Sequence, residues 1–174
     1  RRYWATYGGW SDFFVSPYLH ASLVLLLITY GTWCKDSWWH DVLAVVPSLL
    51  GFSLGTLAIF LGFGNEGFRD VISGKTPDEP GRTSPYMQVT AAFTHFIIVQ
   101  ICAVVVAVIS GALFLLPKPE AGTALYEANE IGGSVLWGFG YWLFLYALCL
   151  AAAAVLAKGA PAKRQPGHEM TKSY

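Results

Sequence analysis

Four long apolar runs, separated by polar segments, set the pattern of this chain. They extend over residues 17–33, 42–63, 87–116 and 134–157, and none of them contains Asp, Glu, Lys or Arg. An α-helix needs about 20 apolar residues to cross roughly 30 Å of hydrocarbon. We therefore predict an all-α, polytopic membrane protein with one transmembrane helix in each run.

The polar segments define the other parts of the chain. Residues 1–14 form an N-terminal segment, residues 15–158 the four-helix transmembrane domain, and residues 159–174 a polar tail. Between the second and third runs, residues 65–73 place Phe68, Val71 and Ile72 on one face of a helix and charged residues on another. This pattern predicts a short helix lying at the membrane surface.

Composition and charge support this interpretation and orient it. Only 13% of the residues are charged, whereas soluble domains carry about 25%. With four crossings, the termini and the middle loop share one side, and nine of the 11 Lys and Arg residues fall there. Because Lys and Arg are enriched on the cytoplasmic side, we predict a multi-pass protein of the cytoplasmic (inner) membrane with both termini inside.

The basic inner face, with Arg69, Lys75 and Arg82 in the middle loop, has a net charge of +3 by our count of its Lys, Arg, Asp and Glu residues. Such a face could contact anionic lipid head groups or a polyanion such as a nucleic acid. Membrane topology alone also accounts for it.

The second run ends in GFGNEG, residues 62–67, which has the spacing of a dinucleotide-binding loop. That motif binds a nucleotide only when a strand precedes it and a helix follows. Here an apolar membrane helix precedes it, so we do not predict a nucleotide site. Gly62, Gly64 and Gly67 instead predict a hinge where the second helix leaves the bilayer at the cytoplasmic mouth of the protein.

Two histidines are the only ionisable side chains within the apolar runs apart from cysteines and tyrosines. His20 in the first run and His95 in the third could together ligate a haem iron, so a b-type haem redox protein is one alternative; otherwise we predict no cofactor. No carboxylate pair, Ser/His/Asp set or metal-spaced cluster occurs in the runs. We therefore predict neither an enzyme nor a metal site.

The second run is unusually rich in small residues. Gly51 and Gly55 form a GxxxG motif, which lets helices pack closely in lipid. Hydroxyl and aromatic side chains follow neighbouring faces of the same helix, a composition that suits an ion path with a hydrophobic gate. Four helices fill their own centre, so we predict such a path on the axis of a homo-oligomer. The candidate pore-lining residues are Ser48, Phe52, Ser53, Thr56 and Phe60.

The stretch PSLLGFSLGTLAIFLGFGNEGFRDVI, residues 47–72, resembles the Ser/Gly/Phe-rich second helix of small bacterial membrane effectors of anti-phage defence, of the Hailong channel-subunit type. The resemblance implies an oligomeric channel kept closed by a soluble regulator, such as a nucleic-acid oligomer, until infection. The leading expectation is thus an ion channel or pore-forming effector. A non-catalytic subunit of a larger membrane complex is the other alternative.

Overall fold

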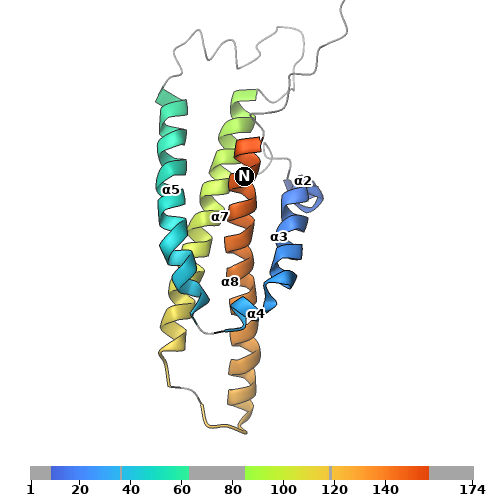
Figure 1. Cartoon of the computed structure of the whole chain (residues 1–174), viewed down its shortest axis with the longest axis vertical. Coiled ribbons are helices and arrows are strands. Elements are labelled where there is room, and N and C mark those ends of the chain that lie inside the picture. The colour runs from blue at the N-terminus through green and yellow to red at the C-terminus, as the bar shows by residue number, and fades with distance from the viewer. Residues whose placement is uncertain (1–8, 36, 63–84, 118, 157–174) are drawn as a thin grey trace, which may run out of the picture.

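The computed structural model describes residues 9–35, 37–62, 85–117 and 119–156 (Figure 1). All regular elements within these ranges are α-helices: α2 (Gly9–Val15), α3 (Pro17–Ile28), α4 (Tyr30–Trp33), α5 (Trp38–Gly62), α7 (Pro85–Phe114) and α8 (Ala124–Leu156). The predicted surface helix 65–73, the polar tail, Gly64, Gly67, Arg69, Lys75 and Arg82 lie outside the described residues.

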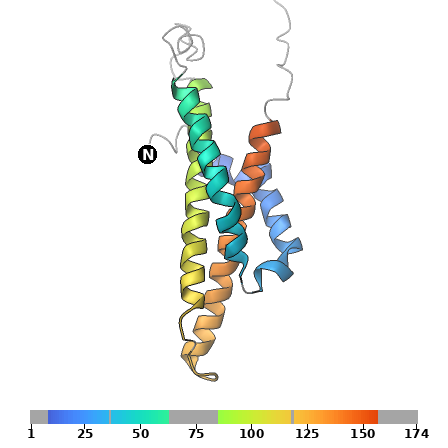
Figure 2. The same ribbon diagram turned by 60° about the vertical axis from the view of Figure 1, so that its left-hand side comes forward.

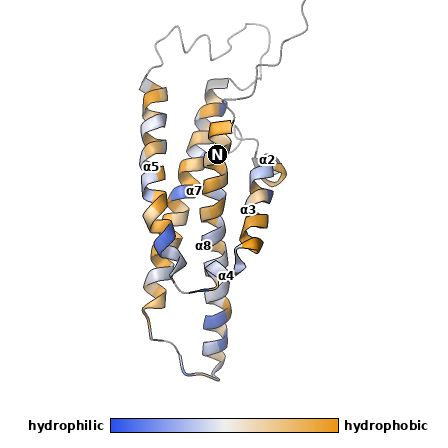
Figure 3. Cartoon of the chain, in the orientation of Figure 1, coloured by the Kyte–Doolittle hydropathy of each residue, from blue (hydrophilic) through white to orange (hydrophobic). Residues whose placement is uncertain are grey.

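Three helices are long and apolar enough to cross a membrane, namely α5, α7 and α8. Apolar residues follow their length, and hydrophilic residues gather in the first turns of α8 (Figure 3). Large apolar side chains on all three helices are exposed, including Leu54, Val105 and Val135. Such a surface suits lipid rather than water. The all-α membrane class is therefore supported, with three spans by length.

The first apolar run is not the single helix predicted for residues 17–33. Helix α3 has only 12 residues, about 18 Å at 1.5 Å per residue. The Thr29 hydroxyl donates to the Leu25 carbonyl at 2.7 Å, and the short helix α4 follows. The indole Nε1 of Trp33 donates to the Leu26 carbonyl, seven residues earlier, at 3.1 Å. The Leu25 carbonyl also accepts the Thr29 amide at 2.9 Å, and the Trp33 bond reaches back across the break between α3 and α4 to a carbonyl of the last turn of α3.

Helix α8 also differs from the prediction, because it begins at Ala124 rather than near residue 134. Thr123 caps it: its Oγ1 accepts a hydrogen bond from the Tyr126 amide at 3.2 Å. Glu127 lies in the first turn, where a negative charge stabilises a helix. Residues 124–133, interpreted from the sequence as loop, are therefore helical. Helix α5 likewise begins at Trp38, four residues before the predicted start.

The long helices and α3 lie in a row in which α5 packs mainly on α7, α7 on α8, and α8 on α3 (Figures 1 and 2). One cluster of buried residues, including Val42, Val46, Ala103, Ala107 and Tyr146, runs through these contacts. Because α5 stands at one end of the row, the other described helices cover only one of its sides.

Three tryptophans from the α4–α5 region pack against glycines of α7 and α8. Trp33 lies over Gly138 and Trp39 over Gly111, where an added Cβ would be 3.3 and 3.1 Å from the rings. Trp38, which is 2% exposed, lies still closer to Gly140. Glycine at these positions leaves room for the indole rings, and so brings the start of α5 close to its neighbours.

Candidate functional site

Helix α5, which carries the candidate pore-lining residues, has one buried face. Val42, Val46 and Ser53 are buried there. The amide nitrogen of Gln100, on α7, donates to the Ser53 hydroxyl at 3.1 Å, and that hydroxyl donates to the Leu49 carbonyl at 2.7 Å. Both Ser53 and Gln100 are at most 1% exposed. Ser53 thus connects α5 to α7 inside one chain.

The structure separates the five candidate pore-lining residues. Ser48 and Phe52 are exposed, Phe52 at 75%. Thr56 and Phe60 are half-buried, and the Thr56 hydroxyl bonds back to the Phe52 carbonyl at 2.9 Å. Ser53 is on the covered face. Only Ser48 and Phe52 among the five are therefore fully presented to a neighbour of the chain.

A continuous line of small residues follows the uncovered side of α5. All of its members are exposed, and an added Cβ on each of its glycines would have nothing within 4 Å. We call it the small-residue seam; it consists of Ala44, Ser48, Gly51, Gly55, Ala58 and Gly62. Its spacings alternate strictly between four and three residues, the repeat with which one helix packs along another. Gly51 and Gly55, predicted as a packing motif, therefore face away from the other described helices.

The Ser53–Gln100 contact allows a test of how the two helices are joined. Ser53→Ala should lower the free energy of unfolding by about 1 kcal/mol, because the Gln100 amide loses its acceptor in an apolar interior. Gln100→Leu should cost less, since Gln100 Oε1 already has no partner among the described residues and Ser53 keeps its bond to Leu49. Unfolding titrations in mixed micelles measure both.

The double variant provides the control for this pair. Adding Ser53→Ala to Gln100→Leu should change the free energy of unfolding little, because no amide remains to lose a partner. Equal costs of Ser53→Ala in the two backgrounds would contradict the coupling of these side chains.

The two candidate haem ligands lie in different surroundings. His20 is exposed on α3, and its Nδ1 lies 2.8 Å from the Ser16 carbonyl. His95 is 5% exposed, and its Nε2 lies 3.1 Å from the Tyr146 hydroxyl of α8. Ligation of iron through Nε2 of His95 would have to replace this hydrogen bond. The local contacts thus give His95 a role in joining α7 to α8.

A second polar contact joins α8 to the short helix α3. The indole Nε1 of Trp142 donates to the Ser22 hydroxyl at 3.1 Å, and Ser22 is fully buried. Trp142 also stacks on Tyr146 with ring centroids 5.8 Å apart. Sequence reasoning missed Ser22, Trp142 and Tyr146. The sequence offered only a weak signal for them: one hydroxyl and two rings with a polar atom, each within an apolar run. Hydropathy alone does not distinguish such buried residues from residues that face lipid.

The contacts described above are packing contacts and polar contacts within and between helices. Among residues 9–35, 37–62, 85–117 and 119–156, no group of three or more His, Cys, Asp or Glu side chains could hold a metal ion. Cys34 and Cys102 are exposed thiols and Cys149 is half-buried. The uncovered seam of α5 is therefore the strongest candidate for function. No protein-family model, curated protein or solved structure matches the chain.

Proposed function

We propose that the protein is an ion channel of the bacterial inner membrane, assembled from several copies, in which α5 of each copy faces its neighbours. The observation that carries this proposal is the uncovered small-residue seam. From Ala44 to Gly62 it covers 18 residue steps, about 27 Å, which is close to the thickness of a bilayer core. A contact along it would extend through the whole membrane.

Close packing of small residues is the main means by which helices associate in lipid, where apolar burial offers little gain. The exposed positions of α7 and α8 include many large residues, such as Val105, Ile109 and Val135, which suit lipid chains. The small-residue seam, by contrast, contains only Ala, Ser and Gly from Ala44 to Gly62. A second copy of α5 fits it better than lipid, because two backbones can approach closely there.

The row-like arrangement supports a path between copies rather than within one. Ser48 lies in the seam and Phe52 on its flank, and both are exposed. In a ring in which the seam of each α5 packs against a different face of the next α5, we place Phe52 of each copy at the axis, where it forms a hydrophobic constriction with the Ser48 hydroxyls one turn away. The channel is closed when these rings keep water out.

Ion flux tests this role of Phe52. In proteoliposomes, Phe52→Ser should increase ion flux by about tenfold or more, because a hydroxyl admits water to the constriction. The matched control is Phe139→Ser, a phenylalanine of α8 that is 48% exposed, and it should leave flux unchanged. Equal flux in both variants and the unchanged protein would refute the proposed path.

Assembly tests the seam separately. The double variant Gly51→Leu with Gly55→Leu should convert the oligomer to smaller particles, since leucines hold the backbones apart. Ala112→Leu, on the exposed side of α7, is the control. The mass of the detergent-solubilised particle is the measurement. Migration of the unchanged protein with unrelated chains would favour the alternative of a subunit in a larger complex.

A role in anti-phage defence, with a soluble regulator or nucleic acid at the cytoplasmic face, extends the same proposal. It is supported by the resemblance of residues 47–72 to the second helix of such effectors. In cells, Phe52→Ser should then be toxic without infection, whereas Phe139→Ser should not. Toxicity is scored as loss of viable cells after induction.

A further inference from the structure

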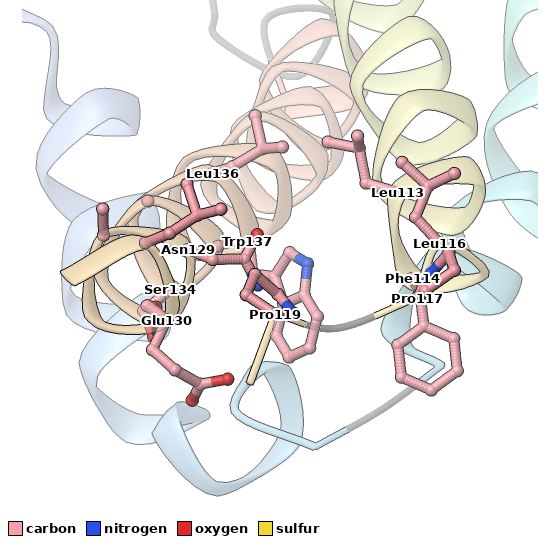
Figure 4. A pocket seen from close by; sticks show the side chains of 14 residues that line it. Leu113, Phe114, Leu116, Pro117, Pro119, Asn129, Glu130, Ser134, Leu136 and Trp137 are labelled. Atoms are coloured by element: carbon pink, nitrogen blue, oxygen red, sulfur yellow. Dashed lines mark hydrogen bonds between the residues drawn. The ribbon is translucent and has the colours of Figure 1, made fainter. Parts of the chain in front are cut away.

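A cavity of about 500 Å³ lies between the end of α7 and the first turns of α8 (Figure 4). It is at the far end of the α7–α8 hairpin, beyond the start of α5 (Figure 1). Its walls include Leu113 and Phe114 of α7 and Leu125, Glu130, Leu136 and Trp137 of α8. The volume falls in the range of about 300–1,000 Å³ found for small-molecule sites.

Aromatic rings form one wall of this cavity. Trp137 and Phe114, which line it, have ring centroids 6.4 Å apart. Trp39 packs behind them, 5.1 Å from Phe114 and 5.9 Å from Trp137. Three packed rings hold the indole of Trp137 in place between the helices. The face of an indole attracts cations more strongly than the face of any other side chain.

The charge of the lining residues also favours a cationic ligand. Among its described lining residues, Glu130 is the only one that carries a charge. In Figure 4 its carboxylate projects from α8 on the side where Pro119 lies. The Ser134 hydroxyl donates to the Glu130 main-chain carbonyl at 2.9 Å, so among the described residues it does not occupy the carboxylate. A carboxylate beside apolar and aromatic walls is complementary to a positive charge on an apolar body.

We propose that this cavity binds a hydrophobic organic monocation, with the charge between Glu130 and Trp137 and the apolar body against the leucines. The same chemistry occurs in soluble amphiphilic amines and in the ammonium head groups of membrane lipids. The site is independent of the proposed channel, because it uses neither the seam nor Phe52.

Equilibrium binding of radiolabelled tetraphenylphosphonium to the full chain in phosphatidylglycerol nanodiscs tests the proposal. Saturable binding is expected, and Glu130→Gln should weaken it at least about threefold. Glu127→Gln is the matched control; Glu127 belongs to the same helix but does not line the cavity, so binding should stay unchanged. Leu113→Trp should weaken binding by narrowing the cavity with Glu130 still present.

Equal affinities of the unchanged protein and Glu130→Gln would overturn the proposal, as would equal effects of Glu127→Gln and Glu130→Gln. The series is repeated with Lys118→Gln, since Lys118 lies between Pro117 and Pro119 in the sequence and could compete for the carboxylate. Loss of Glu130-dependent binding in phosphatidylethanolamine nanodiscs would identify the lipid head group as the ligand. Unchanged binding there would identify a soluble cation.

Discussion

Gly140→Ala is expected to lower the free energy of unfolding by about 1–3 kcal/mol, the usual cost of forcing a methyl group into a packed interior. A Cβ on Gly140 would lie 2.7 Å from Cγ1 of Val106 and would overlap the ring of Trp38. Trp38 is 2% exposed, so its ring has nowhere to move without separating α5 from α8. Unfolding titrations in mixed micelles provide the measurement.

Gly133→Ala is the matched control, because Gly133 belongs to the same helix and an added Cβ there meets nothing within 4 Å. It should stabilise the protein by up to about 1 kcal/mol through helix propensity. Trp38→Phe should relieve much of the cost of Gly140→Ala, since it removes the far end of the indole. Additive costs of these two changes would show that the ring and the glycine are not in contact.

His95→Ala is expected to lower the free energy of unfolding by about 2–4 kcal/mol, because histidine, a residue of intermediate burial in most proteins, is here part of the core. The change removes a ring that is 5% exposed and that lies edge-on to Phe13 and Tyr146 at centroid distances of 6.1 and 6.0 Å. It also removes the bond from His95 to the Tyr146 hydroxyl, which is buried. The free energy of unfolding in mixed micelles measures this.

His20→Ala is the control, because it replaces a histidine that is exposed rather than buried. His20 is exposed on α3, so its replacement should change stability by no more than about 0.5 kcal/mol. The same preparations give an absorbance spectrum after expression with haem. A Soret band that disappears in both variants alike would instead support the haem alternative for this pair.

The long spans were predictable because their signal is redundant. Residues 42–63 and 87–116 contain no Asp, Glu, Lys or Arg, and the observed α5 and α7 match them to within a few residues at each end. The start of α8 was not predictable in this way, because a hydropathy pattern assigns the polar stretch TALYEANEIGG, residues 123–133, to a loop. The better signal was Thr123 before a run of helix-forming residues, which is a capping pattern and not a hydrophobic one.

Which face of α5 is covered could not be predicted from its own residues. Small and hydroxyl side chains occur all around this helix, so Ser48 and Ser53 look alike in the sequence. What distinguishes them is Gln100, 47 positions after Ser53, which donates to Ser53 across the α5–α7 contact. The break at Thr29 is similar, since it depends on a bond from Trp33 to the carbonyl of Leu26.

The shortness of α3 has a consequence for the surrounding bilayer. Its 12 residues span about 18 Å, whereas the 30 residues of α7 span about 45 Å. Lipids beside α3 therefore meet a hydrophobic strip much shorter than the bilayer core. Such a mismatch is relieved by thinning the bilayer locally, at a fraction of a kcal/mol per Å. The α3 side of the protein is thus expected to favour thin membrane.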